Sequence, residues 1–412
     1  MTVVSSPLVA PFVGEHFSAL DRLSDLLAPP YDVIAEAERG TLASQHEHNI
    51  VHLILPQGDG DRYAQAAARL DRWRSDGVLV AGESPAVYVV QQEFTMPGGR
   101  TMVRSGLVGA VAAEPFETGR VKPHERTHRG PKQDRLALMR ATRTMFEALL
   151  MLTRDPAGEL ARSVTGVVNG GSPWVVARVR GDDIRVWRVE GLAAYRLADA
   201  AGRDALYIAD GHHRFETAVA FRAEFPFAER TLAMVVSLSD PGLVVLSTHR
   251  VIYGRALGND VSGRLGTSCH VLELGVGDHH AALANVKAAG GGCVAVLSGG
   301  RLLALTRRPE ADPRLLTPFH QAVRRLDVTW TDAYVVSALR EACDGRLGYS
   351  SDGAEVVAEV RAGQALVGVL LNPPAVADVL DVADAGGFMP QKSTYFLPKV
   401  PSGLVLFPYH RR

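Results

Sequence analysis

The feature that most limits how this chain can fold is a short charged junction in its middle. An apolar, β-prone run at 205–209 ends abruptly at Asp-Gly-His-His-Arg (210–214), and a helix-compatible segment follows at 215–223. This order predicts a strand, a tight turn and a helix, with the charged groups collected between them. A helix N-terminus offers N–H groups and a positive dipole end to an anion. Arg214 can grip a phosphate or a carboxylate through two hydrogen bonds.

Two interpretations of this junction are open. In the functional one, Asp210 holds a metal ion or orients one of the histidines, while Arg214 and the helix N-terminus hold an anion. In the structural one, Asp-Gly is an ordinary turn, the Asp210 side chain caps the helix, and the histidines face water. We favour the functional interpretation because the charged and histidine side chains at 210–214 directly follow a segment that is predicted to be a buried strand.

Composition limits the class of protein. The 412 residues are enough for two or three domains, each with its own core. An apolar fraction of 47% and a charged fraction of 22% are typical of a soluble globular protein. The formal net charge of −1 gives neither a basic field for nucleic acid nor an acidic excess for a basic partner. We therefore expect no nucleic-acid partner.

Cysteine usage and apolar runs indicate the compartment. Cys269, Cys293 and Cys343 lie far apart without a CxxC or CxxH spacing. This argues against a disulfide framework or a cysteine-based zinc site and fits a reducing environment. Residues 1–12 lack the pattern of a signal peptide, and no apolar run is long enough to span a membrane. We expect a cytoplasmic protein with no membrane partner.

The order of expected elements indicates an α+β fold. Helices are expected at 16–27, 61–76, 133–152, 215–223, 281–289, 354–360 and 374–385. Strands are expected at 50–55, 86–94, 106–113, 174–179, 184–189, 203–209, 232–238, 243–246, 293–297, 302–306 and 365–371. Residues 158–173 are expected to form a connection. Because strands and helices mix without strict βαβ alternation, the α+β class fits better than a purely parallel α/β fold.

Two further clusters carry chemistry. Lys-Pro-His-Glu-Arg-Thr (122–127) lies in a polar loop broken by glycine and proline, with Lys132 and Arg135 close behind. Such a loop could supply a general base and a phosphate clamp, or it could be an ordinary solvated loop. Gln-Lys-Ser-Thr (391–394) could contact an anion through Lys392, the hydroxyls and backbone N–H groups, or it could be a simple turn before a strand.

A metal site is also compatible with these residues. An oxygen-ligated magnesium ion brought in with a nucleotide suits Asp210 and Glu125 best. A zinc or iron site is the alternative, and its candidate ligands are His124, Glu125, His128, Asp210, His212 and His213.

Four motifs spread over nearly the whole chain resemble a known family. They are Ala-Pro-Pro-Tyr-Asp-Val (28–33), Lys-Pro-His-Glu-x-Thr (122–127), Ala-Asp-Gly-His-His-Arg-x-Glu-Thr (209–217) and Met-Pro-Gln-Lys-Ser-Thr (389–394). By these motifs, in this order, the chain is identified as a member of a widespread prokaryotic family named as domain of unknown function 1015. The second and third motifs also resemble the signature of the free serine kinases of the ParB/sulfiredoxin superfamily. Those enzymes move a phosphoryl group from ADP or ATP to the hydroxyl of free L-serine.

The resemblance implies a fold and a division of the chain. It implies a ParB/sulfiredoxin-like catalytic core at 105–250, an N-terminal α/β segment at 1–104 and a C-terminal α/β segment at 251–412 that completes the site. It also implies an enzyme that uses Mg²⁺ with ADP or ATP on a small-molecule substrate. A homodimer is compatible with it.

The resemblance further assigns roles to individual residues. Glu125 matches the catalytic carboxylate that accepts the serine hydroxyl proton, and Asp210 lies near that hydroxyl or the metal ion. The residues implied to bind the nucleotide phosphates are Lys122, Gly211, His212, His213, Arg214 and Lys392. The residues implied to bind the substrate are His124, Thr127, Ser393 and Thr394. Two other functions stay open: a phosphohydrolase or metal-dependent hydrolase that uses the same site, and a non-catalytic nucleotide-binding sensor.

Overall fold

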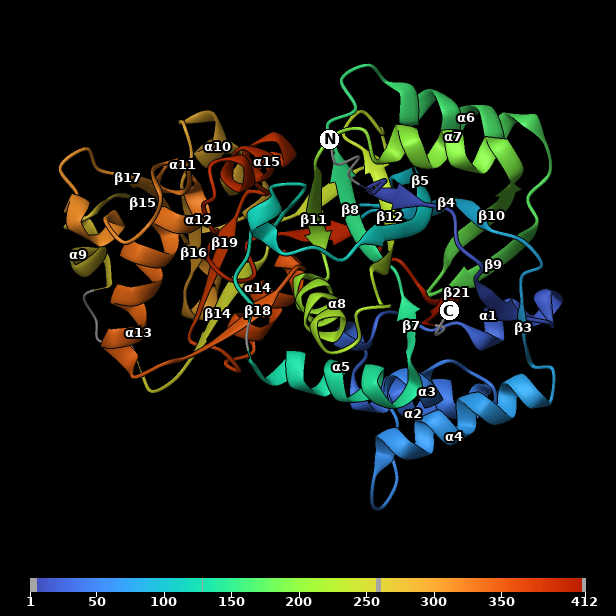
Figure 1. Cartoon of the computed structure of the whole chain (residues 1–412). Helices are drawn as coiled ribbons and strands as arrows, with labels where there is room; N and C mark the ends of the chain where they lie inside the picture. Colours follow the sequence, from blue (N-terminus) through green and yellow to red (C-terminus); the bar gives the residue numbers. More distant parts are fainter. Residues whose placement is uncertain (1–5, 128, 257–260, 410–412) are drawn as a thin grey trace. The chain divides into compact units, whose positions relative to one another are not determined.

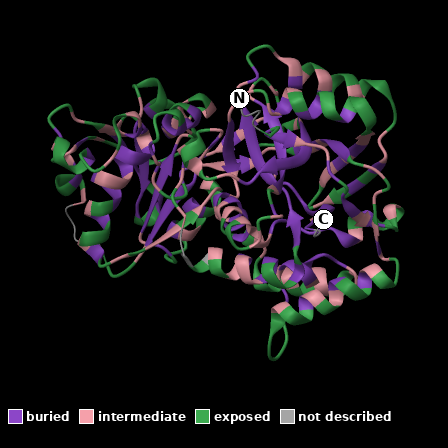
Figure 2. Ribbon diagram, in the orientation of Figure 1, coloured by how far each residue is buried: buried purple, intermediate pink, exposed green. Residues whose placement is uncertain are grey.

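The computed structural model describes residues 6–127, 129–256 and 261–409, and its contacts divide the chain into two compact units (Figure 1). Unit 1 consists of the described parts of Met1–Pro123, Thr127–Leu243 and Pro398–Arg412. Unit 2 consists of His124–Arg126 and the described part of Val244–Leu397. Both units are mixed α/β structures with large sheets, and most of their strand residues are buried (Figure 2).

This division differs from the three expected segments. The boundary expected at 104/105 falls inside β5 (Thr101–Ala112), which pairs with β4 (Ala86–Thr95) over most of that strand. The boundary expected at 250/251 falls inside β14 (His249–Tyr253), a strand of unit 2. Strand pairing joins distant parts of the chain, so segment composition alone does not place such boundaries.

Unit 1 is organised around a nine-stranded sheet within the described residues. Its strand order is β6-β11-β8-β12-β5-β4-β10-β9, and β1 also pairs with β5. Most neighbours are antiparallel, whereas β8 runs parallel to β12 and β6 runs parallel to β11. Helices α6 and α7 lie side by side against β4 and β5 (Figure 1). A four-stranded sheet of order β3-β2-β21-β7 completes the unit.

The elements of unit 1 are as follows. Its strands are β1 (Val9–Ala10), β2 (Glu15–Phe17), β3 (Leu79–Ala81), β4, β5, β6 (Val121–Lys122), β7 (Thr144–Glu147), β8 (Leu149–Thr153), β9 (Val175–Val179), β10 (Asp182–Glu190), β11 (Leu206–Asp210), β12 (Arg230–Ser237) and β21 (Ser402–Pro408). Its α-helices are α1 (Leu23–Leu26), α2 (Glu36–Gln45), α3 (Val51–Ile54), α4 (Arg62–Ser75), α5 (Arg129–Thr142), α6 (Glu159–Gly170), α7 (Gly191–Ala201) and α8 (His212–Glu224).

Unit 2 contains a six-stranded sheet of order β15-β17-β16-β19-β14-β18 and a separate pair, β13 with β20. Its strands are β13 (Val244–Leu246), β14, β15 (Cys269–Val276), β16 (Cys293–Val296), β17 (Arg301–Arg307), β18 (Arg346–Ser350), β19 (Val367–Leu371) and β20 (Tyr395–Leu397). Its α-helices are α9 (Val261–Gly266), α10 (His279–Ala288), α11 (Gln321–Arg324), α12 (Asp327–Trp330), α13 (Ser337–Cys343), α14 (Gly353–Arg361) and α15 (Val376–Asp384). A π-helical turn, Thr331–Val336, follows α12 directly.

Many expected elements are confirmed. The strand and helix around the charged junction are β11 and α8, and the expected hairpin at 174–189 is the antiparallel pair β9–β10. The expected helix at 61–76 is α4, whose first turn is capped by the Asp61 side chain. These segments have the hydrophobic period or turn residues that their structure needs.

Four local expectations are wrong. Residues 50–55 form the helix α3 instead of a strand, because the Asn49 side chain accepts the Val51 N–H at 2.9 Å and starts a helical turn. The helix expected at 133–152 ends at Thr142, since Arg143 adopts a φ of +48° and the apolar run beyond it forms β7 and β8. The expected connection at 158–173 contains α6. The helix expected at 16–27 is split between β2 and short helical turns.

Candidate functional site

The charged junction is the turn between β11 and α8 in unit 1. β11 ends at Asp210, Gly211 has a φ of +97°, and α8 begins at His212. A Cβ atom on Gly211 would lie 2.5 Å from Leu149 Cδ2 and 3.1 Å from Arg214 Nε. Both the backbone conformation and the lack of space therefore require glycine at this position.

Asp210 is held between two cations. Its Oδ2 accepts a hydrogen bond from Arg214 Nη2 at 2.7 Å, and its Oδ1 accepts one from Lys399 Nζ. Burial works against ionisation, but the Lys399 ammonium and the Arg214 guanidinium outweigh it and hold the pKa of Asp210 well below its ordinary value. The N-cap residue of α8 is Gly211, and both oxygens of the Asp210 carboxylate are hydrogen-bonded to cations.

Arg214 faces inward from the first turn of α8. Its side chain is only 4% exposed, and Nη1 donates to the carbonyl of Ala148 at 3.2 Å. A second carboxylate, Glu147, lies 4.0 Å from the same nitrogen. Arg214 is therefore fixed by neighbours on both sides.

Glu147 connects the Asp210–Arg214 pair to the first motif, at 28–33. Its Oε1 accepts hydrogen bonds from the Tyr31 N–H at 2.8 Å and from the Ser402 hydroxyl at 2.9 Å. Burial raises the pKa of the Tyr31 phenol to about 12. The Arg135 guanidinium lies 4.1 Å from the centre of the Tyr31 ring and donates to the carbonyl of Ile54. The Ala-Pro-Pro-Tyr-Asp-Val motif is thus packed into the same polar network.

A buried glutamine extends the network into the large sheet. The Gln92 amide donates to the carbonyl of Lys399 at 2.9 Å and accepts from Arg104 Nη2 at 2.5 Å. Burial lowers the pKa of Arg104 to about 10. The network therefore runs from Arg104 through Lys399 to the Asp210–Arg214 pair. Buried charge is costly unless it is paired or hydrogen-bonded, and at the junction Asp210 pairs with both Arg214 and Lys399.

Sequence reasoning missed three charged members of this network, Arg104, Glu147 and Lys399, and the polar members Gln92 and Ser402. A signal was present for two of them. Arg104 and Glu147 are single charged residues inside apolar runs that form β5 and the β7–β8 segment. A charge in that setting is rarely buried without a partner.

Other cations of unit 1 gather around Tyr207 on β11. Lys122 Nζ lies 5.7 Å from the centre of the Tyr207 ring, and the Arg154 guanidinium carbon lies 5.6 Å from it. Arg154 Nε also donates to the Tyr207 hydroxyl at 3.2 Å. Elsewhere, Lys132 forms an ion pair with Glu216 of α8 at 2.5 Å. Thr127 also belongs to unit 1.

The middle of the second motif, His124–Arg126, meets the fourth motif in unit 2. His124 is buried, and its Nε2 is hydrogen-bonded to the Thr394 hydroxyl at 3.1 Å. The carbonyl of His124 accepts the Met389 N–H at 2.8 Å, and Glu125 forms a parallel bridge with Met389. The Ser393 hydroxyl donates to the carbonyl of Pro390 at 2.5 Å. The proposed substrate residues His124, Ser393 and Thr394 are therefore neighbours.

A fully buried arginine holds the turn that carries Lys392. Arg250 binds Asp332 in a bidentate pair, with Nε–Oδ1 and Nη2–Oδ2 distances of 2.8 and 2.9 Å. Its Nη1 donates to the carbonyl of Lys392 at 3.3 Å and to that of Thr248. Lys392 has a φ of +52°, and its side chain is exposed. Arg250 thus fixes the backbone of this turn and leaves the Lys392 side chain outside.

The structure does not assemble a metal site from the described residues. No three His, Cys, Asp or Glu side chains converge there, and His128 lies outside the described residues. Asp210 does not fit the role of a Mg²⁺ ligand, because both of its oxygens are hydrogen-bonded to cations that an ion would have to displace.

Comparison with known proteins places the chain in a family. The sequence model of the family described as "Protein of unknown function (DUF1015)" matches residues 9–329. The chain belongs to this family. The match covers the first three motifs of this DUF1015 protein, whereas the fourth, at 389–394, lies beyond it. No curated protein matches the chain.

Several solved structures resemble this DUF1015 protein at low identity. A conserved hypothetical protein from Pyrococcus furiosus is 14% identical, with a TM-score of 0.37, over 69% of this chain and 90% of that one. A free serine kinase in complex with AMP is 12% identical, with a TM-score of 0.39, over 71% and 90%. SbnI with a C-terminal truncation, from Staphylococcus aureus, is 11% identical, with a TM-score of 0.36, over 71% and 87%. Likenesses at this level do not decide the function.

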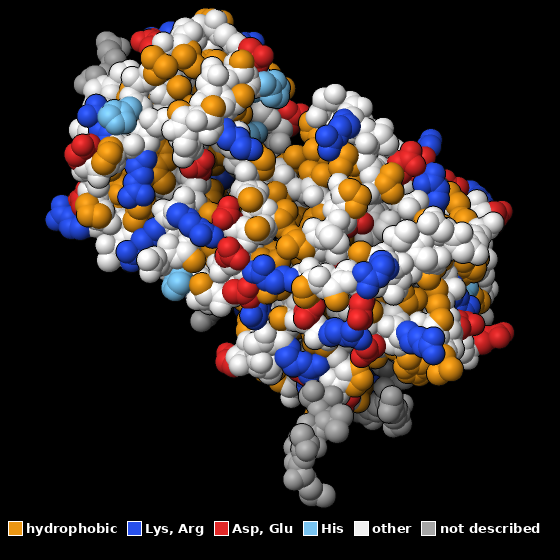
Figure 3. Space-filling model, turned by 90° about the horizontal axis from the view of Figure 1, so that it is seen from above, with side chains coloured by type: hydrophobic (Ala, Val, Ile, Leu, Met, Phe, Trp, Pro, Cys, Tyr) orange, Lys and Arg blue, Asp and Glu red, His pale blue; other side chains and the backbone are white. Residues whose placement is uncertain are grey.

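The remaining observations concern the charge of the surface and the length of the helices. Lys and Arg side chains are interspersed with Asp and Glu on the face drawn in Figure 3, in keeping with the net charge of −1. Within the described ranges, none of the helices combines the length and the apolar character that crossing a bilayer requires.

Proposed function

We propose that this chain is a nucleotide-dependent phosphotransferase that moves a phosphoryl group from ADP or ATP to the hydroxyl of a small molecule, with free L-serine as the leading acceptor. The observation that carries the proposal is the Asp210–Arg214–Lys399 network at the N-terminus of α8. Phosphoryl transfer needs positioning and charge neutralisation more than covalent chemistry from the protein. A turn with a buried arginine and a partly buried lysine beside a helix N-terminus supplies both requirements.

The proposed phosphate contacts start from this turn. The first turn of α8 directs its N–H groups out of the helix end, where a phosphate would accept them. In the proposal, the residues that bind the nucleotide phosphates are Lys122, Gly211, His212, His213, Arg214 and Lys392. Arg214 contributes through its charge and by fixing the turn, because Asp210 and the Ala148 carbonyl already occupy two of its donors.

The proposed acceptor side lies on the second and fourth motifs. Glu125 is the base that accepts the proton of the acceptor hydroxyl, and His124, Thr127, Ser393 and Thr394 hold the acceptor. The contacts among His124, Thr394 and the Met389 backbone support this grouping. Asp210 serves as a positioning residue in this scheme. Mg²⁺ enters with the nucleotide phosphates, which are its ordinary oxygen ligands in such sites.

Three further parts of the proposal follow the motif resemblance: a ParB/sulfiredoxin-like core at 105–250, flanking segments at 1–104 and 251–412, and a homodimer. A cytoplasmic location is proposed from the cysteine usage and the N-terminal sequence.

The test is a Glu125→Gln variant, with Glu117→Gln, an exposed carboxylate in the turn Phe116–Thr118, as its matched control. Each protein is incubated with Mg²⁺, ADP or ATP, and a pool of free amino acids and hydroxy compounds, and phosphorylated products are identified by mass spectrometry. We expect phosphoserine from wild type and from Glu117→Gln. Glu125→Gln is expected to form no product but to retain nucleotide binding. Full activity in Glu125→Gln would refute the assigned mechanism.

Two other results would point to different functions. Phosphate release without any acceptor, at the rate of nucleotide loss, would identify a hydrolase. Strong nucleotide binding without turnover on any acceptor in the pool would identify a sensor.

A further inference from the structure

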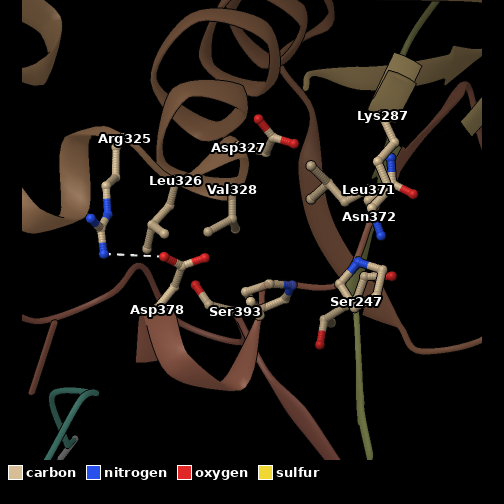
Figure 4. Close-up of a pocket in the computed structure, with 14 residues that line it drawn as sticks. Ser247, Lys287, Arg325, Leu326, Asp327, Val328, Leu371, Asn372, Asp378 and Ser393 are labelled. Atoms are coloured by element: carbon tan, nitrogen blue, oxygen red, sulfur yellow. Dashed lines mark ion pairs between the residues drawn. The ribbon is translucent and has the colours of Figure 1, made fainter. Parts of the chain in front are cut away.

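A cavity of about 460 Å³ lies wholly within unit 2, between the C-terminal end of β19 and the first turn of α15 (Figure 4). We call it the α15 cavity. Its polar lining comes from several elements: Lys287 near the end of α10, Asp327 at the start of α12, Asn372 after β19, Asp378 in α15 and Ser393 in the fourth motif. None of these residues except Ser393 has a role in the proposed reaction.

The charged side chains that line the α15 cavity are Arg325 with its partner Asp378 and two separate groups, Lys287 and Asp327. Arg325 forms ion pairs with Asp378 at 3.1 Å, on one side of the cavity (Figure 4), and with Asp381 at 3.3 Å. Lys287 lies on another side and has no carboxylate within ion-pair distance among the described residues. Asp327 lies between these two sides in the view. One cation and one carboxylate are therefore available to a ligand.

Asp327 is held in place by the glycine turn that precedes β16. The Asp327 carboxylate packs so closely against this turn that a Cβ atom on Gly291 would lie 2.5 Å from Oδ1. Burial raises the pKa of Asp327. A partly buried carboxylate of this kind gains from a cationic partner, because the ion pair offsets the cost of desolvation.

The charge balance and the volume of the α15 cavity indicate which class of ligand it can bind. The named cations and carboxylates of the cavity cancel, so it has no excess positive charge for a nucleotide polyphosphate. A serine-sized molecule takes up roughly 100 Å³ if its heavy atoms fill about three to four water volumes. The cavity has room for a larger molecule, and Leu326, Val328 and Leu371 give it an apolar wall.

We propose that the α15 cavity binds a small zwitterion of dipeptide size, with the ligand carboxylate on Lys287 and the ligand ammonium on Asp327. Ser393 lines the same cavity, and its hydroxyl already donates to the Pro390 carbonyl, so its oxygen can accept a hydrogen bond from the ligand. The next residue, Thr394, is bonded to His124. The binding of this ligand does not rest on the proposed function, whose leading acceptor is free L-serine.

Calorimetric titration of the full chain, without nucleotide, tests the assignment. The probes are glycyl-L-serine, L-serine, glycerol and inorganic phosphate. We expect glycyl-L-serine to bind at least tenfold more tightly than L-serine, and the other two to bind more weakly still. Asp327→Asn and Lys287→Met are each expected to weaken the dipeptide at least tenfold. Asp344→Asn and Arg301→Met, which change exposed charges of unit 2 outside the cavity, should leave its affinity unchanged.

Three results would overturn the assignment: no saturable binding of the dipeptide, dipeptide binding that both cavity variants retain, or glycerol or phosphate binding as tightly as the dipeptide. Circular dichroism and melting temperatures, compared with the two control variants, verify that the cavity variants are folded. If the dipeptide binds as expected but no phosphoryl transfer occurs, the proposed function fails while the cavity assignment stands.

Discussion

Removal of the Lys399 ammonium is the sharpest test of the buried network in unit 1. A Lys399→Met change leaves Asp210 with Arg214 as its hydrogen-bonded cation, at 2.7 Å. Breaking a fully buried ion pair costs about 3–5 kcal/mol. The Lys399 and Asp210 side chains are 13% and 17% exposed, and Arg214 remains, so we expect about half of that range, ~2 kcal/mol, at pH 7.

The dependence of this loss on pH follows from the lowered pKa of Asp210. A carboxyl group with a depressed folded pKa stabilises the protein above its unfolded value of about 4, and this contribution is lost as the pH falls through the folded value. The difference between wild type and Lys399→Met should therefore be complete at pH 7 and shrink below about pH 4.

Urea unfolding of both proteins between pH 7 and pH 3 measures this difference. Lys132→Met is the matched control, because the Lys132–Glu216 pair is more exposed, at 33% and 26%, and should contribute less than about 1 kcal/mol. A loss in Lys399→Met that is no larger than in Lys132→Met, or one that does not change with pH, would refute the reasoning.

The remaining predictions concern backbone strain and acid sensitivity. Gly211→Ala forces a Cβ atom toward Leu149 at a φ of +97° and should lower the free energy of unfolding by about 3 kcal/mol, measured by urea titration against Gly119→Ala, where φ is also positive but nothing lies within 4 Å. Burial, with a smaller effect from Arg250, lowers the pKa of His249 to about 4. A histidine with a lowered folded pKa binds more protons when unfolded, so stability should fall as the pH drops from about 6.5 to 4. His249→Gln should show a smaller fall in melting temperature over that range, and an unchanged fall would contradict this origin.

The parts of the structure that could be predicted are those whose causes are local. The β11–α8 junction follows from an apolar run, an Asp-Gly turn and a helix-compatible segment, all within residues 205–223. The expected strand at 50–55 failed because a short apolar run fits a strand and a helix turn equally well, and the side chain of Asn49 decides between them.

The partners of the junction could not be predicted for a different reason. Lys399 lies 189 residues from Asp210 in the sequence, and no local sequence pattern at either residue predicts the contact. Glu147 reaches Arg214 only because β7 and β8 replace the C-terminal half of an expected helix. The meeting of His124 with Thr394 likewise depends on a long chain path. The motifs identified these residues as candidates, but which residues they contact is determined by the tertiary fold.

The return of the chain to unit 1 after unit 2 has a consequence for synthesis on the ribosome. Residues 398–409 supply Lys399 and the strand β21, which lies between β2 and β7 in the four-stranded sheet. A nascent chain released only as far as Leu243 has Asp210 and Arg214 but neither the ammonium nor the strand. All of unit 2 must therefore leave the ribosome before residues 398–409 can complete unit 1. The network around Asp210 is among the last contacts that the growing protein can form.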